Sequence, residues 1–248
     1  MKLTDYNKFI TANWKMNGSL SLAEQFESFF LNKFNNLKNL NAAIILCPPT
    51  PYLFKFKKIS KKFDNFFIGA QDCSTKKNGS ITGDVSSTIL KDLGCEFVIL
   101  GHSERRLVFK ENEEVISKKI HNSLKENIIP IFCIGENLQQ KKEKLTKEVL
   151  EFQILKSLPK NIDLNKIIIA YEPVWSIGTG LIPKIEEISD THHFIKNTVL
   201  RNNNTKVLYG GSVKANNYKR ILDAVNVDGL LIGGASLNLD EFNQILNF

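Results

Sequence analysis

The sequence predicts an α/β protein, a single domain over residues 1–248 folded as one (β/α)8 barrel. Three observations support this fold class. The chain has 248 residues, close to the roughly 250 of such a barrel. Short apolar runs alternate along it with longer amphipathic stretches, which indicates a parallel sheet. No run has the polar character of an exposed sheet edge, so closure into a barrel is favoured over an open sheet.

Eight apolar runs are expected to form the strands. Their apolar residues are continuous and do not alternate with polar ones, which is typical of parallel strands buried on both faces. In chain order the runs are Phe9–Trp14, Ala42–Cys47, Phe66–Ala70, Phe97–Leu100, Ile128–Ile134, Ile167–Tyr171, Lys206–Tyr209 and Gly229–Ile232.

The stretches between the runs have the spacing of helices. After the first run, apolar residues recur with helical spacing at Leu20, Ala23, Phe26, Phe29 and Phe30, and Ser19 or Ser21 offers an N-cap. Nothing between the runs resembles a flexible linker, which agrees with one domain.

The net charge of +7 and the pI of about 9.1 would suit an anionic partner, whether nucleic acid, a membrane surface or a small substrate. There is no focused basic stripe with interleaved aromatic residues, so nucleic-acid binding is not expected. The lysines are scattered over helix-like segments, where we expect solvated charge and a mild field that attracts phosphates. Two such groups are Lys55, Lys57, Lys58, Lys61 and Lys62, and Lys141, Lys142 and Lys144.

The cysteines indicate a reducing compartment. Cys47, Cys73, Cys95 and Cys133 form no Cys-x-x-Cys pair, and the histidines lack zinc spacing, so we expect free buried thiols and no metal site. Residues 1–6 have no apolar core of a signal peptide, and no apolar run approaches membrane-spanning length. The cytoplasm is therefore the expected location, without membrane attachment.

Polar residues stand out at the ends of the predicted strands. Asn13 and Lys15 close the first run, Gln71 follows the third, His102 follows the fourth and Glu172 ends the sixth. In a (β/α)8 barrel the carboxyl ends of all strands meet at one face, where active sites are found. The sequence therefore predicts that these residues surround one pocket.

Glycine pairs follow the last two runs, as Gly210-Gly211-Ser212 and Gly233-Gly234. Each pair alone would more often mark a tight turn, but two pairs at adjacent strand ends favour a phosphate site built from backbone N–H groups. Gly178-Thr179-Gly180 is not a dinucleotide fingerprint, because the third glycine is missing and Pro183 follows.

His102 and Glu172 have ordinary alternatives. A histidine at an apolar strand end is often only structural, and a glutamate after an apolar run can point to solvent. If the Glu172 carboxylate faces the His102 imidazole across a pocket, a functional role is favoured for both residues. The remaining histidines, His121, His192 and His193, lie in helix-like segments and are expected at the surface.

Seven motifs together resemble the triosephosphate isomerase family, in the family's order and across nearly the whole chain. They are Asn13-Trp14-Lys15-Met16-Asn17-Gly18, Leu100-Gly101-His102-Ser103-Glu104-Arg105-Arg106, Cys133-Ile134-Gly135-Glu136, Ala170-Tyr171-Glu172-Pro173-Val174-Trp175, Ile177-Gly178-Thr179-Gly180, Tyr209-Gly210-Gly211-Ser212-Val213 and Gly233-Gly234-Ala235-Ser236-Leu237. The resemblance implies a TIM barrel. It also implies the interconversion of dihydroxyacetone phosphate and D-glyceraldehyde 3-phosphate in glycolysis and gluconeogenesis, with no cofactor and no metal.

The resemblance also implies the roles of the site residues. Glu172 is the base, His102 the electrophile and Lys15 a cation facing the phosphate and the developing enediolate; Asn13 touches the substrate and Glu104 holds Lys15. The family's own scheme of a glutamate base and a neutral histidine supplies this assignment. The resemblance implies that the phosphate is bound by Gly178, Ser212, Gly233 and Gly234. It gives Cys133 a supporting role in the site.

By the same resemblance a lid closes over the pocket, with proline and glycine as hinges. It consists of Pro173, Val174, Trp175, Ser176, Ile177, Gly178, Thr179 and Gly180. The chain departs from the family in two respects here. Ser176 stands where the lid commonly has alanine, and Leu181-Ile182-Pro183 replaces the frequent continuation after Gly180.

A homodimer is the expected assembly. Ser80-Ile81-Thr82-Gly83-Asp84 resembles the family's dimer loop at Thr82 and Gly83, and Thr82 is expected to reach the partner's pocket near Asn13. The segment from Asp72 to Ser86 is long for a loop in a compact barrel, which favours a functional role over mere surface flexibility.

Two rival functions remain open from the sequence. A Schiff-base aldolase would use Lys15 as nucleophile, but it gives no role to a glutamate on the sixth strand followed by a lid. A non-catalytic barrel would be expected to have lost part of the constellation, yet Lys15, His102 and Glu172 are all present.

Overall fold

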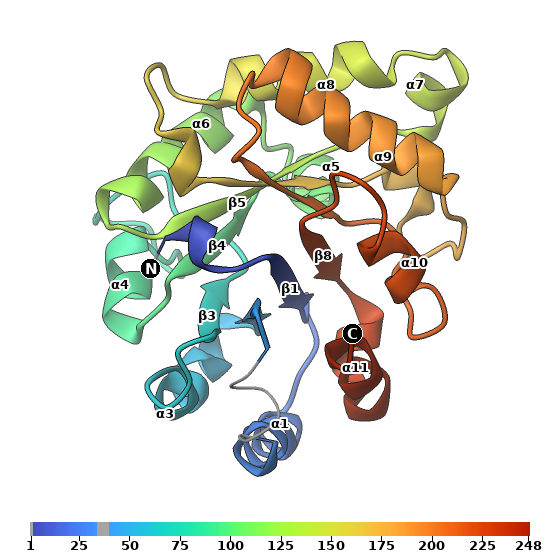
Figure 1. Cartoon of the computed structure of the whole chain (residues 1–248). Coiled ribbons are helices and arrows are strands. Elements are labelled where there is room, and N and C mark those ends of the chain that lie inside the picture. Colours follow the sequence, from blue (N-terminus) through green and yellow to red (C-terminus); the bar gives the residue numbers. More distant parts are fainter. Residues whose placement is uncertain (1, 34–39) are drawn as a thin grey trace.

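The computed structural model describes residues 2–33 and 40–248. Met1, the first residue of the N-terminal segment 1–6 considered above as a signal peptide, lies outside the described residues. Eight parallel strands close into a barrel in chain order, with helices around the outside (Figure 1). Each strand pairs with the next, and β8 pairs with β1. The strands are β1 (Lys8–Asn13), β2 (Ala42–Cys47), β3 (Phe66–Ala70), β4 (Phe97–Leu100), β5 (Ile129–Ile134), β6 (Ile168–Tyr171), β7 (Lys206–Tyr209) and β8 (Gly229–Ile232).

This architecture confirms the predicted fold class. Predicted and observed strands differ by one residue at four places. β1 begins at Lys8, one residue before its predicted start, and Trp14 lies beyond its end, while Ile128 and Ile167 precede β5 and β6. The side chains of Trp14, Ile128 and Ile167 are nevertheless fully buried, because the apolar runs extend slightly past the assigned strands.

Helical segments connect the strands. The expected cap of the first is Ser19, whose Oγ accepts a 3.0 Å hydrogen bond from the amide of Leu22. The α-helices are α1 (Leu20–Asn32), α3 (Lys57–Ser60), α4 (Ser87–Leu93), α5 (Ser103–Val108), α6 (Glu113–Lys125), α7 (Leu138–Lys142), α8 (Thr146–Ser157), α9 (Ile185–His193), α10 (Tyr218–Leu222) and α11 (Leu239–Leu246). Shorter 3-10 segments are η1 (Leu3–Asp5), η2 (Thr50–Phe56), η3 (Leu164–Lys166), η4 (Val174–Ser176) and η6 (Gly234–Leu237), and η5 (Phe194–Val199) is π-helical.

The apolar side chains form two layers. Phe9 of β1 belongs to a cluster of strand residues inside the barrel, together with Phe97 and Leu208. Ile10 and Ala12, the intervening residues of β1, belong to a second cluster that includes residues of the surrounding helices. Alternate side chains of one strand thus enter two different cores, which explains why the runs are continuously apolar.

The four cysteines are buried and free, as expected. Burial raises the pKa of the Cys73 and Cys95 thiols to about 12, so both are unreactive thiols at neutral pH. Within the described residues, no helix has the length and apolar character needed to cross a bilayer.

The prediction that His192 lies at the surface is wrong, whereas His121 and His193 are exposed. His192 has no exposed surface, and burial lowers its pKa to about 3. Its ring packs edge-on against Tyr171, with the ring centroids 6.0 Å apart. Lys196 is also buried, and its Nζ lies 2.6 Å from Oδ2 of Asp228.

Candidate active site

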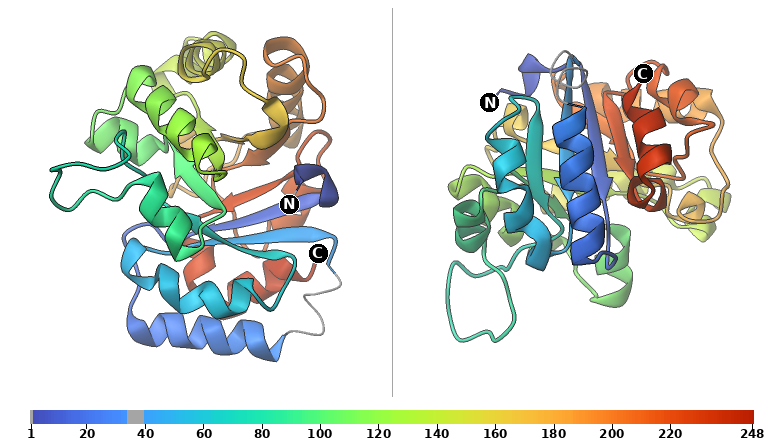
Figure 2. Two further views of the ribbon diagram at one scale, coloured as in Figure 1. Left: turned by 90° about the vertical axis from the view of Figure 1, so that its left-hand side faces the viewer. Right: turned by 90° about the horizontal axis from the view of Figure 1, so that it is seen from below.

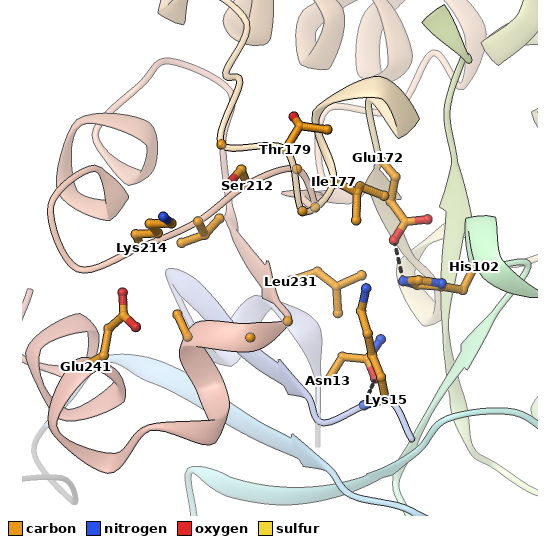
Figure 3. Close-up of a pocket in the computed structure, with 18 residues that line it drawn as sticks. Asn13, Lys15, His102, Glu172, Ile177, Thr179, Ser212, Lys214, Leu231 and Glu241 are labelled. Carbon is orange, nitrogen blue, oxygen red and sulfur yellow. Dashed lines mark hydrogen bonds and ion pairs between the residues drawn. The ribbon is translucent and has the colours of Figure 1, made fainter. Parts of the chain in front are cut away.

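A cavity of about 370 Å³ opens at the carboxyl ends of the strands. It is lined from β1, β4, β6, β7 and β8, and Figure 3 shows Asn13, Lys15, His102 and Glu172 facing it. The structure thus brings together residues that are far apart in the sequence. The other lining residues are Ile177, Gly178, Thr179, Gly180, Gly210, Gly211, Ser212, Val213, Lys214, Leu231, Gly233, Gly234, Ala235 and Glu241.

Lys15 is held in an unusual backbone conformation by its neighbours. Its φ is +54°, in the left-handed region that side chains other than glycine rarely adopt. The amide of Lys15 donates to Oδ1 of Asn13 at 2.9 Å, and its carbonyl accepts from Nε2 of Gln71 at 2.8 Å. Its Nζ lies 2.7 Å from Oε1 of Glu104. Gln71 therefore supports the backbone of Lys15 and does not line the cavity.

Glu172 and His102 contact each other inside the cavity. Oε1 of Glu172 lies 2.9 Å from Nε2 of His102, and the two side chains are only 2% and 6% exposed. Oε2 of Glu172 accepts a 3.0 Å hydrogen bond from the amide of Ser103. Gly210 makes room for this carboxylate, because a Cβ built there would lie 2.9 Å from Cγ of Glu172.

His102 caps helix α5 with its ring. Nδ1 accepts a 3.2 Å hydrogen bond from the amide of Glu104, and the neutral imidazole with its proton on Nε2 is the form that makes this bond. Burial lowers the pKa of His102, but the facing carboxylates of Glu172 and Glu104 raise it by more, so the pKa is above its ordinary value. The proton on Nε2 points toward Glu172.

A cradle of backbone groups lies on the far side of the cavity from the Glu172–His102 pair. Ser212 is largely buried there, while Gly233 and Gly234 sit at the start of η6. A Cβ at Gly233 would come 3.3 Å from Cε of Lys15, so this glycine leaves room for the lysine side chain. Figure 3 places Lys214 at the same end of the cavity as Ser212.

The segment expected to be the lid lies at the rim. Its first residues form η4, and Ser176 is fully buried, whereas Gly178, Thr179 and Gly180 are exposed. Gly178 and Gly180 have φ of +71° and +79°, and a Cβ at either would meet no atom within 4 Å. The tip of the segment therefore lines the mouth of the cavity while its glycines remain exposed to solvent.

Sequence reasoning missed two contributors to the site. Glu136 has no exposed surface, and its Oε1 accepts a 2.8 Å hydrogen bond from the indole of Trp175. Glu136 ends the motif Cys133-Ile134-Gly135-Glu136, for which the sequence predicted no role at this position. Lys214 lines the cavity and directly follows the motif that ends at Val213. Cys133, in contrast, belongs to the cluster inside the barrel and does not line the cavity.

The described part of the chain offers no group of three or more histidine, cysteine, aspartate or glutamate side chains that could hold a metal ion. The charged and titratable groups that line the cavity are instead the carboxylates of Glu172 and Glu241, the imidazole of His102 and the ammonium groups of Lys15 and Lys214, beside a set of backbone amides. These are suited to proton transfer next to an anionic group.

Comparison with known proteins gives a consistent result. The family model described as triosephosphate isomerase matches residues 8–248. The chain is 42% identical to the triosephosphate isomerase of Mycoplasma mobile over 96% of this chain and 98% of that protein. It is 40% identical to that of Francisella tularensis subsp. mediasiatica, over 97% and 96%. The crystal structure of triosephosphate isomerase from Bartonella henselae is similar with a TM-score of 0.87 and 32% identity, over 97% of this chain and 98% of that one.

Proposed function

The chain belongs to the triosephosphate isomerase family, and from this premise we propose that it converts dihydroxyacetone phosphate into D-glyceraldehyde 3-phosphate and back, with Glu172, His102 and Lys15 as its catalytic residues. The observation that carries the proposal is the buried contact between the Glu172 carboxylate and the His102 imidazole at 2.9 Å. A base and a proton donor so placed can act on adjacent atoms of one small substrate.

Glu172 moves the proton between the two carbons. Its carboxylate takes the proton from C1 of dihydroxyacetone phosphate, and the electrons of that C–H bond form the C1–C2 double bond of an enediolate. The same carboxylate returns the proton at C2 to give the aldehyde. In the substrate-free structure the carboxylate is bonded to His102 and to the amide of Ser103, so it must leave both to reach the substrate.

His102 and Lys15 stabilise the charge that develops on the substrate oxygens. The proton on Nε2 of His102 is donated to the oxygen that gains charge, and the ammonium group of Lys15 lies on the cavity wall beside it. Once Glu172 turns toward the substrate, the influence that raises the pKa of His102 is reduced while burial remains. This change favours the neutral imidazole, which can pass a proton between the two oxygens.

The amides of Gly178, Ser212, Gly233 and Gly234 are proposed to bind the substrate's phosphate. Small residues allow the backbone to approach a phosphate closely, and backbone N–H groups suit its oxygens. Closure of the segment from Pro173 to Gly180 would bring Gly178 to the phosphate and exclude water. Water exclusion suppresses loss of phosphate from the enediolate.

The proposal is tested by a coupled assay of D-glyceraldehyde 3-phosphate conversion without added metal or nucleotide. Glu172→Gln keeps the size of the side chain and removes the base, so kcat should fall at least ~100-fold, with an unchanged circular-dichroism spectrum. Glu151→Gln, at an exposed glutamate of α8 that does not line the cavity, serves as the matched control. A Glu172→Gln variant with near wild-type kcat would show that another group is the base.

The Schiff-base alternative is less well supported by the geometry. An aldolase nucleophile must be a neutral amine, but Nζ of Lys15 lies 2.7 Å from the carboxylate of Glu104, an arrangement that suits an ammonium cation. Borohydride treatment in the presence of substrate should therefore leave Lys15 unmodified.

A homodimer is proposed as the working assembly. The loop between β3 and α4 projects from the body of the protein in both views of Figure 2, and Thr82 near its tip is exposed. Large apolar side chains elsewhere in the chain are also exposed, among them Met16 at 97% and Phe109 at 62%. Insertion of the loop into a second copy, with Thr82 near the partner's pocket, would cover such surface.

Two further proposals complete the functional picture. Residues 1–248 act as one domain, since all eight strands are needed to close the barrel. The protein works in the cytoplasm, where its buried free thiols remain reduced.

A further inference from the structure

The hydroxyl group of Ser176 connects three parts of the structure. Its Oγ donates to the carbonyl oxygen of Leu181 at 2.5 Å and accepts from the amide of Ser212 at 3.3 Å. It also lies 3.4 Å from the hydroxyl of Tyr209. A hydroxyl has one proton and two acceptor positions. Because its proton is used by Leu181, Tyr209 is the donor in the third contact, and the hydrogen-bonding capacity of Ser176 is filled.

The surroundings of Ser176 are shaped for this hydroxyl. The side chain has no exposed surface, so each of its bonds is costly to leave unmade. Gly211 allows the close approach of the loop after β7. A Cβ at that position would collide with the hydroxyl of Tyr209 and would lie 2.9 Å from Oγ of Ser176.

The bond to Leu181 joins the middle of the lid to the residue that follows it. Ser176 ends η4 and is the fourth residue of the lid, and Leu181 follows the last one. Thr179 strengthens this closed loop, since its Oγ1 lies 3.2 Å and 3.1 Å from the carbonyl oxygens of Trp175 and Ser176 and accepts from the amide of Leu181 at 3.2 Å. The segment from Trp175 to Leu181 is therefore bonded internally and can move as one unit.

The amide of Ser212 has one proton and two acceptors that compete for it. In the structure this proton points to Oγ of Ser176. In the proposed function the same amide binds the substrate's phosphate. A charge-assisted hydrogen bond is shorter and roughly twice as strong as a neutral one, so a phosphate oxygen displaces the hydroxyl of Ser176 when it binds.

We propose that Ser176 is a positioning residue that holds the Ser212 amide in the substrate-free protein and yields it to the substrate's phosphate, which releases the lid for closure. The inference rests on the proposed function, because it takes Ser212 as a phosphate contact. The trigger is the phosphate group itself, so a triose without phosphate leaves the Ser176–Ser212 bond intact. The bond to Leu181 persists, and the segment from Ser176 to Leu181 moves together.

The test compares Ser176→Ala with wild type in titrations with inorganic phosphate, followed by calorimetry and by the ¹⁵N–¹H resonance of the Ser212 amide. Without the competing hydroxyl, Ser176→Ala should bind inorganic phosphate about 2- to 10-fold more tightly, the range that one neutral hydrogen bond accounts for. The Ser212 resonance should shift in the free variant. Thr179→Ala disturbs the lid without touching the Ser212 amide, so it should not tighten phosphate binding.

Kinetics separate this role from a purely structural one. For D-glyceraldehyde 3-phosphate, Ser176→Ala should lower both KM and kcat, because phosphate binds more tightly but no longer controls the release of the lid. For D-glyceraldehyde, which has no phosphate, kcat/KM should not fall, because the variant lacks the Ser176–Ser212 bond that only a phosphate displaces in the wild type. Equal losses with both substrates would indicate structural damage and would overturn the proposal.

Unchanged phosphate affinity together with an unchanged Ser212 resonance in Ser176→Ala would also overturn it. If this variant does not fold, hydrogen exchange on the wild type decides. Saturating inorganic phosphate should change the exchange rates of the Thr179 and Leu181 amides, and equal rates with and without phosphate would contradict the coupling. Failure of the proposed function is seen separately, as absence of wild-type isomerase turnover in the coupled assay.

Discussion

The indole Nε1 of Trp175 donates a 2.8 Å hydrogen bond to Oε1 of Glu136, a carboxylate with no exposed surface. The hydroxyl of Tyr171 lies 3.2 Å from the same oxygen, and the amide of Val174 donates to the carbonyl of Glu136 at 3.0 Å. The start of the lid is thus fixed to the end of β5 through one residue. Burial raises the pKa of Glu136, and the hydrogen bonds from Trp175 and Tyr171 limit that rise.

We expect Trp175→Phe to loosen the lid. The variant keeps an aromatic ring but loses a hydrogen bond to a charged group, worth about 1.5–3 kcal/mol. Amides from 174 to 181 should therefore exchange with solvent roughly 10- to 100-fold faster. Tyr171→Phe removes the longer bond to the same oxygen and should have a smaller effect. Unaltered exchange in Trp175→Phe would show that Glu136 does not anchor the lid.

His102→Gln should lower kcat by roughly 10²–10³-fold through lost polarisation of the substrate oxygens. Glutamine can still donate a hydrogen bond, but it cannot pass a proton between two oxygens. KM should change little, since the phosphate contacts are intact. Steady-state kinetics of purified, folded variant check this, and a kcat within a few-fold of wild type would remove His102 from the mechanism.

Burial of His192 makes the stability of the fold sensitive to acid. Its pKa falls to about 3 in the folded protein, so only the unfolded chain takes up the proton below the ordinary value near 6.5. The contribution to stability is complete above about pH 6.5 and is lost at up to ~1.4 kcal/mol per pH unit as the pH falls toward 3. Denaturant unfolding of His192→Gln should show a flatter pH dependence than wild type over this window. The exposed His193→Gln should follow wild type.

Thr82→Arg should dissociate the dimer, because the proposed contact inserts Thr82 into the partner near Asn13 and a long cationic side chain does not fit there. Sedimentation velocity at micromolar concentration should show a dimer for wild type and a monomer for the variant, with reduced kcat. Val225→Arg adds the same charge at a side chain that is 71% exposed and should leave the dimer intact. A monomeric wild type would contradict the predicted assembly.

Much of the fold could be predicted because the strands lie between two apolar layers. Such strands give continuous apolar runs, so their number and order could be read directly, with errors of one residue at strand ends. The burial of His192 was missed although a signal exists. Ile188, His192 and Ile195 are spaced as one face of a helix, and all three are buried. Lys196 has the spacing of the same face, but a lysine is rarely buried without an acidic partner, and its partner Asp228 is distant in the sequence, so its burial could not be inferred from periodicity.

The positions of the site residues followed from where the strands end, but their contacts did not. The bond between Ser176 and Leu181 depends on how the chain turns between them, and sequence spacing does not determine this. The glycine pair after β7, Gly210 and Gly211, was expected to form part of a phosphate-binding site. The structure adds that Gly211 makes room for two hydroxyl groups, which depends on packing between β7 and the lid.

The pairing of β8 with β1 has a consequence for synthesis of the chain on the ribosome. Phe9 of β1 pairs with Gly229, and Asn13 and Gly233 face the same cavity. A nascent chain that ends before β8 therefore has an open sheet with two unsatisfied edges and only part of the phosphate cradle. Substrate can stabilise the folded state only after translation has passed the eighth strand, so until then the growing barrel depends on its own packing or on chaperones.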